Sequence, residues 1–196
     1  MPQQHKCFNV VGNASKPFLL TTVRPRKLFG DEQLIEEFIQ RLVKVETLDE
    51  GWSEKYLDEP SGQLWVKYSV DTYAGRWMQK ILVIFPPPNK DELIQIALTS
   101  FHLDEVWAAA KRLNDEEEIN KIEFRQELID RLDEVDYNHL NAEERERIRV
   151  VIEASGLTNR LNKRDTIGKH YNEILKDAEF FRQISISSER ILSFLR

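Results

Sequence analysis

The proline triplet Pro86-Pro87-Pro88 divides this chain into two parts with different hydrophobic periodicity. Proline fixes its own φ angle and has no amide hydrogen to donate, so neither a sheet nor a helix continues through three in a row. Apolar residues alternate with polar ones just before the triplet, which is typical of strands, and recur at helical spacing after it. The sequence therefore predicts an α+β protein, with a mixed α/β domain over residues 1–85 and an all-helical domain over residues 89–196.

The N-terminal part begins with signals for one strand and one helix. A β-prone run within residues 16–23 favours a strand. Asp31 suits the N-cap of a helix, because its side chain accepts a hydrogen bond from the first helical turn. Apolar residues then recur at helical spacing from Leu34 to Val45, and we expect this helix to end before Asp49.

An aromatic-rich β-hairpin is expected next. Residues 63–70 and 76–85 both alternate between apolar and polar side chains, and the second run is apolar on both faces near its end. The five residues between them include Gly75, which supplies the unusual dihedral angles of a tight turn. The N-terminal half is therefore expected to contain a strand, a helix and a hairpin.

The part after the proline triplet predicts helices to its end. A very short connector around His102 predicts that the first two helices pack as a pair. The apolar pattern from Ile167 to Ile184 predicts a later helix, with a last short helix at Ile191–Leu195. Three pairs of residues have the spacing of an N-terminal capping box. These pairs are Asn89 with Glu92, Asp115 with Glu118, and Asn141 with Glu144.

The composition predicts a folded protein that works in the cytoplasm. Apolar residues make up 41% of the chain and charged residues 32%, which is too apolar for a disordered chain and too charged for a membrane protein. No stretch approaches the ~20 apolar residues that a bilayer span requires. Cys7 is the one cysteine, so an internal disulfide is excluded and a reducing compartment is expected.

No pattern in the sequence indicates catalysis, a metal site or a cofactor. Metal sites need several histidine, cysteine or carboxylate ligands at short spacing, and phosphate-binding loops need closely spaced glycines before a helix. The seven glycines are dispersed. We therefore predict a non-catalytic protein without a metal or cofactor. The four histidines also lie far apart in the sequence: His5, His102, His139 and His170.

The net charge of −6 is concentrated in one segment. Residues 91–144 carry 16 Asp and Glu but 5 Lys and Arg, a balance of −11. Such an acidic block repels nucleic acid and attracts basic proteins, so we expect a protein partner and no nucleic acid. The alternative interpretation is that charged helix faces keep a small domain in solution.

Six aromatic residues fall within a 26-residue stretch and have two interpretations. Aromatic side chains anchor protein interfaces, and they also fill the cores of small sheets. Tyr73, at the expected hairpin tip, is the least easily explained as a core residue, and we take it with Trp77 as a candidate for partner binding. The six residues are Trp52, Tyr56, Trp65, Tyr68, Tyr73 and Trp77.

The same stretch resembles a known family. Gly51-Trp52, Tyr56, Asp58, Pro60, Gly62, Trp65 and Tyr68 form the pattern G-W-x3-Y-x-D-x-P-x-G-x2-W-x2-Y. This pattern is similar to the core signature of a small family of bacterial immunity proteins from polymorphic toxin systems. The resemblance covers the residues from Gly51 to Tyr68. It implies a cytoplasmic antidote that binds and neutralises a cognate toxin.

Under this resemblance the acidic block gains a function. Many toxins are nucleases with basic clefts, and an acidic antidote would be steered to them quickly. An adaptor whose helical half binds a peptide or protein, and an enzyme with an unfamiliar active site, remain alternative hypotheses. A toxin gene immediately upstream would favour the antidote. The candidate contact residues in the block are Glu116, Glu117, Glu118, Asp133, Glu134 and Asp136.

Overall fold

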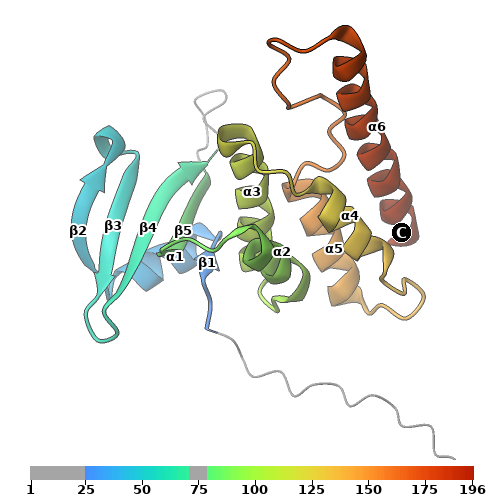
Figure 1. Ribbon diagram of the computed structural model, residues 1–196. Helices are drawn as coiled ribbons and strands as arrows, with labels where there is room; N and C mark the ends of the chain where they lie inside the picture. The colour runs from blue at the N-terminus through green and yellow to red at the C-terminus, as the bar shows by residue number, and fades with distance from the viewer. Residues whose placement is uncertain (1–24, 71–78) are drawn as a thin grey trace, which may run out of the picture.

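The computed structural model describes residues 25–70 and 79–196, which form an antiparallel sheet followed by helices (Figure 1). The sheet has five strands in the order β1-β5-β4-β3-β2, and all neighbouring strands are antiparallel. The predicted α+β class is therefore confirmed. The strands are β1 (Leu28–Phe29), β2 (Val43–Leu48), β3 (Ser53–Asp58), β4 (Gln63–Val70) and β5 (Gln79–Phe85).

One helix precedes β2 and five follow the sheet. Two of the three predicted capping boxes are present, because the side chains of Asn89 and Asn141 accept hydrogen bonds of 2.9 Å from the amides of Glu92 and Glu144. No helix within the described residues is long and apolar enough to cross a bilayer. The helices are α1 (Glu32–Ile39), α2 (Lys90–Thr99), α3 (Leu103–Asn120), α4 (Arg125–Asp133), α5 (Ala142–Ala154) and α6 (Tyr171–Phe194).

Strands β4 and β5 pair as the alternating sequences predict. Their register runs from Val70 opposite Gln79 to Leu64 opposite Phe85. The expected turn between them, the start of the second predicted run and the predicted strand at 16–23 lie outside the described residues. Strand β5 lies between β1 and β4, which is the central position that its long apolar run indicates.

Helices pack against both faces of the sheet at β5. Leu82 lies in one apolar cluster with Ile35 of α1, whereas Ile81 and Val83 belong to the core formed with α2 and α3. Successive side chains of a strand point to opposite faces. The apolar residues at consecutive positions of β5 therefore serve two different cores.

The helix predicted from Asp31 is shorter than expected. Asp31 is its N-cap and accepts a hydrogen bond of 2.9 Å from the amide of Leu34, but α1 ends at Ile39. Residues 43–48 form β2 instead, which pairs with β3 at the edge of the sheet. The prediction of a helix through Val45 is wrong because β-branched residues in this stretch fit a strand better than a helix.

Two boundaries in the helical half also differ from the prediction. Asp115 does not cap a helix, because α3 runs past it to Asn120. The last two expected helices are one continuous helix, α6, in which the hydroxyl of Ser188 donates to the carbonyl oxygen of Ile184 at 2.8 Å. That bond satisfies a polar side chain inside a helix. Ile167 precedes α6 and is 95% exposed.

Three rings from different elements pack between the sheet and α1. Trp65 of β4 lies 4.8 Å from Phe38 of α1 and 5.8 Å from Phe29 of β1, measured between ring centroids. Tyr56, which is opposite Trp65 in the sheet register, is also buried. These two members of the aromatic stretch are therefore core residues, whereas Trp52 is 53% exposed.

The larger core joins the sheet to the helical half. One cluster of buried apolar side chains includes Leu28 and Val83 of the sheet together with Leu113 of α3 and Ile152 of α5. The two halves proposed from the proline triplet therefore share apolar packing through α3. A buried carboxylate strengthens this contact, because Glu105 of α3 accepts a hydrogen bond of 2.8 Å from the amide of Lys27 before β1.

Gly30 allows the chain between β1 and α1 to pass close to α3. A Cβ atom at this position would lie 2.5 Å from the Trp107 ring and 2.7 Å from the backbone oxygen of Asp104. We expect Gly30→Ala to lower the free energy of unfolding by about 1–3 kcal/mol, because overpacking forces side chains or backbone to move. Urea denaturation would measure the change. Ser61→Ala in an exposed turn is the control, and an equal effect of both substitutions would contradict the prediction.

Candidate functional site

The three consecutive glutamates predicted as contacts, Glu116 to Glu118, lie in the last turns of α3. Glu116 pairs with Arg112 in the same helix, and Glu118 pairs with Lys163 at 2.9 Å. Glu117 is buried, and both its carboxylate oxygens accept from Nε of Arg125. Glu117 is therefore part of the interior, while its two neighbours lie in ion pairs at the surface.

The other three predicted acidic contacts lie at the end of α4 and just after it. Asp133 pairs with Arg190 of α6 at 2.7 Å. Asp136 accepts from the His139 ring at 2.7 Å, and this hydrogen bond lowers the pKa of the Asp136 carboxyl. Glu134 is exposed and lines a groove. The predicted aromatic contacts Tyr73 and Trp77 lie outside the described residues.

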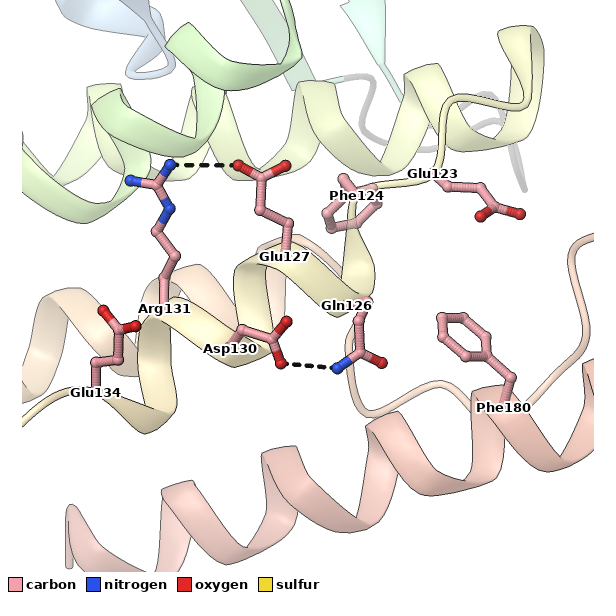
Figure 2. Close-up of a pocket in the computed structure, with 8 residues that line it drawn as sticks. All are labelled: Glu123, Phe124, Gln126, Glu127, Asp130, Arg131, Glu134 and Phe180. Carbon is pink, nitrogen blue, oxygen red and sulfur yellow. Dashed lines mark hydrogen bonds and ion pairs between the residues drawn. The ribbon is translucent and has the colours of Figure 1, made fainter.

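The groove that contains Glu134 runs between α4 and α6 and has a volume of about 670 Å³. Figure 2 shows Phe180 rising from α6 toward the beginning of α4, with Asp130 and Gln126 on the side of α4 that faces α6. Four carboxylates and one cation line it. We call it the α4 groove, and its lining residues are Glu123, Phe124, Gln126, Glu127, Asp130, Arg131, Glu134 and Phe180.

Three of the four carboxylates of the α4 groove are held by neighbouring side chains, and Glu123 among them pairs with Arg164 at 2.8 Å. Glu127 accepts from Lys90 at 2.8 Å and from Arg131 at 3.3 Å, and the pKa of its carboxyl is lowered, first by Lys90. Asp130 accepts a hydrogen bond of 2.7 Å from the amide of Gln126. Ordered carboxylates of this kind lose little further side-chain freedom when a cation binds them.

The aromatic end of the groove adds apolar surface. Phe124 is buried and offers almost no surface, so the accessible ring is that of the half-buried Phe180, which lies beneath the Arg164 guanidinium with 4.5 Å between the guanidinium carbon and the ring centroid. Aromatic faces attract lysine and arginine side chains. The groove thus combines carboxylates with an aromatic wall, which is a chemistry suited to long cationic side chains.

Sequence reasoning found one residue of this groove and missed the other acidic members. Glu123, Glu127, Asp130 and Glu134 are spaced by four, three and four residues, which is a helical spacing. In the structure Glu127 and Asp130 lie within α4, while Glu123 precedes the helix and Glu134 follows it. This spacing could have indicated from the sequence that the four carboxylates lie on one side of the same segment. The approach of α6, which closes the groove, is a contact between distant segments and has no local signature.

The structure thus combines an antiparallel sheet that has helices on both faces with a helical half that carries an acidic groove. Within the described residues, no group of three or more histidine, cysteine, aspartate or glutamate side chains is placed to hold a metal ion. No family model, curated protein or solved structure is significantly similar to this chain.

Proposed function

We propose that this protein is a non-catalytic binding protein whose α4 groove receives a basic segment of a protein partner. The observation that supports it is the charge of the groove, which four carboxylates and a single arginine line. Glu123 and Glu127 are paired with Arg164 and Lys90, so the negative charge open to a partner comes mainly from Asp130 and Glu134. A concave surface of one sign concentrates the field and attracts the opposite charge. Lysine and arginine side chains are therefore the most favourable ligands for this negatively charged surface.

Charge and the aromatic wall have different roles in the proposal. Complementary charge raises the association rate and disfavours wrong partners, while exposed ion pairs add about 0.2–1 kcal/mol each. Phe180 provides a surface on which the aliphatic stem of a lysine or arginine can pack. A segment that alternates basic and apolar residues would use both features.

We further propose that the partner is a toxin and that this protein is its cytoplasmic antidote. The support is the resemblance of residues 51–68 to immunity proteins. In the structure these residues form the β3–β4 hairpin, in which Tyr56 lies opposite Trp65 in the core. The residues of the signature therefore build the hairpin, and we propose that the toxin contacts the α4 groove instead.

Reversing the charge of the groove should weaken binding. We expect the double variant Asp130→Lys with Glu134→Lys to bind a fluorescently labelled peptide of alternating arginine and leucine at least tenfold more weakly, because two attractions become repulsions. Fluorescence anisotropy would measure the affinity. Raising the salt from 0.1 M to 1 M, where the screening length falls from about 10 Å to about 3 Å, should weaken binding by the wild type far more than by the variant.

The matched control is Glu143→Lys with Glu153→Lys on α5, which changes the net charge equally at exposed positions outside the groove. Circular dichroism would verify that each variant is folded. Equal loss of affinity in the two double variants would show that only the total charge matters and would contradict a binding site in the groove.

The antidote proposal needs a separate experiment. A protein captured from source cells by the wild type, but not by the groove variant, should arrest growth when it is expressed alone, and co-expression of the wild type should restore growth. If the captured protein is harmless, the adaptor hypothesis replaces the antidote. If variants at the exposed residues Ile167 and Tyr171, but not those in the groove, abolish capture, the site itself is wrongly assigned.

A further inference from the structure

A second cavity lies beside the α4 groove and has the opposite charge. Its volume is about 280 Å³, and it shares Glu123 and Phe180 with the groove. It lies where the end of α3, the start of α4, the segment before α6 and α6 itself meet. Five cations and three carboxylates line it. We call it the Arg125 pocket, and its cations are Lys121, Arg125, Lys163, Arg164 and Lys169.

Arg125 lines this pocket and has one buried donor without a hydrogen-bond partner. The residue is 1% exposed, Nε donates to both oxygens of Glu117 at 2.8 and 2.9 Å, and Nη1 donates to the carbonyl oxygen of Gly156 at 2.9 Å. Nη2 is buried and has no hydrogen-bond partner. A buried donor without an acceptor costs about 1–3 kcal/mol, and more when it is charged. The guanidinium packs over the Phe181 ring, with 4.9 Å between its carbon and the ring centroid, which offsets part of this cost, and an acceptor that reached Nη2 would remove the remainder.

Three of the other cations have carboxylate partners behind the pocket wall. Lys169 and Arg164 each pair with Asp177 at 2.7 Å, and Lys163 pairs with Glu118 at 2.9 Å. Neither Asp177 nor Glu118 is among the residues that line the pocket. The hydrogen bonds to Lys169 and Arg164 lower the pKa of the Asp177 carboxyl, so this anchor stays ionised. Within the pocket wall, Arg164 also pairs with Glu123 at 2.8 Å and Lys121 with Asp165 at 3.9 Å, so the three lining carboxylates balance part of the charge and leave an excess of two cations.

A purely structural function explains the ion pairs but not the cavity. The pairs of Lys163 and Arg164 tie the segment before α6 to α3 and α6, as surface clamps do. Ion pairs with only a structural role do not require an empty volume between the cations, or an Nη2 on Arg125 that lacks a hydrogen-bond partner. Both features are accounted for by a small acceptor that binds several cations at once.

We propose that the Arg125 pocket binds a phosphate group. Arginine and lysine together are the side chains that proteins use for phosphate, because charge-assisted hydrogen bonds to it are short and strong. The volume is at the low end for ligand sites, which favours a free phosphate or a single phosphate ester. The proposal does not depend on the proposed partner, and the pocket shares only Glu123 and Phe180 with the α4 groove.

The test is isothermal titration calorimetry with inorganic phosphate at constant ionic strength. We expect one saturable site whose affinity falls about tenfold or more in Lys169→Gln, because one charge-assisted bond is lost. Lys80→Gln on β5 is the matched control, since its side chain is 34% exposed compared with 33% for Lys169 and lies outside the pocket. The control should bind phosphate as the wild type does.

Arg125→Lys extends the test to the buried group. It keeps a cation beside Glu117 but removes the planar donor set, so phosphate binding should be lost while circular dichroism stays unchanged; Lys169→Gln gives the result if this variant does not fold. Adenosine monophosphate, titrated in parallel, distinguishes a phosphate ester from free phosphate, and binding of either supports the site. Absence of saturable binding of both, or equal affinities in Lys169→Gln and Lys80→Gln, would overturn the proposal.

Discussion

Arg125→Ala is expected to lower the free energy of unfolding by about 3–5 kcal/mol, because it leaves the carboxylate of Glu117 buried without its partner. The Glu117 side chain is 8% exposed, and the other cation beside it, Lys163, lies 3.9 Å away, which is too far for a hydrogen bond. The carbonyl oxygen of Gly156 loses its donor as well. Urea denaturation followed by circular dichroism would measure the change.

Two further variants separate the loss of the pair from the loss of volume. Arg182→Ala removes an exposed ion pair with Glu179 on α6 and should leave the free energy of unfolding nearly unchanged. The double variant Arg125→Met with Glu117→Leu removes both charges and should recover most of the lost stability. If Arg125→Ala were no more destabilising than Arg182→Ala, the pair could not be buried in solution.

Trp65→Ala should lower the free energy of unfolding by about 3–5 kcal/mol as well, for a different reason. Trp65 is 5% exposed and packs against Phe29 and Phe38, so its removal leaves a cavity between the sheet and α1. No buried charge is involved. Denaturant unfolding with the same readout would allow the two effects to be compared directly.

Trp52→Ala is the control for this position, since Trp52 belongs to the same aromatic stretch but is 53% exposed. We expect it to change stability by no more than about 0.5 kcal/mol. Similar effects of the two substitutions would show that α1 does not cover Trp65 in solution. A benefit of the pair is that both variants retain three of the four tryptophans, which keeps fluorescence usable.

Local sequence patterns predicted the elements that local physics determines. The hairpin of β4 and β5 and the capping boxes at Asn89 and Asn141 follow from alternation and from short-range hydrogen bonds, and they are present. Residues 43–48 were assigned to a helix because their apolar spacing fits either structure. Pairing with β3, which is a contact made across a turn, decides in favour of the strand.

The sites depend on contacts that no local pattern encodes. Glu117 and Arg125 are eight residues apart on different helices, and only the turn between α3 and α4 brings them together. Arg164 and Lys169 reach the same cavity from the segment before α6. Read along the chain, Glu117 belongs to an acidic surface, whereas in three dimensions it balances a buried cation.

The position of helix α3 limits how far the two halves can move when a partner binds. It stands between the sheet and helices α4, α5 and α6 (Figure 1), and its consecutive alanines Ala108, Ala109 and Ala110 are fully buried. Hinge bending between the two halves would expose this seam to water, which is unfavourable in proportion to the apolar area uncovered. We therefore expect the backbone to shift by less than ~1 Å on complex formation. A partner must fit a preset surface, and docking it as a rigid body is the appropriate first approximation.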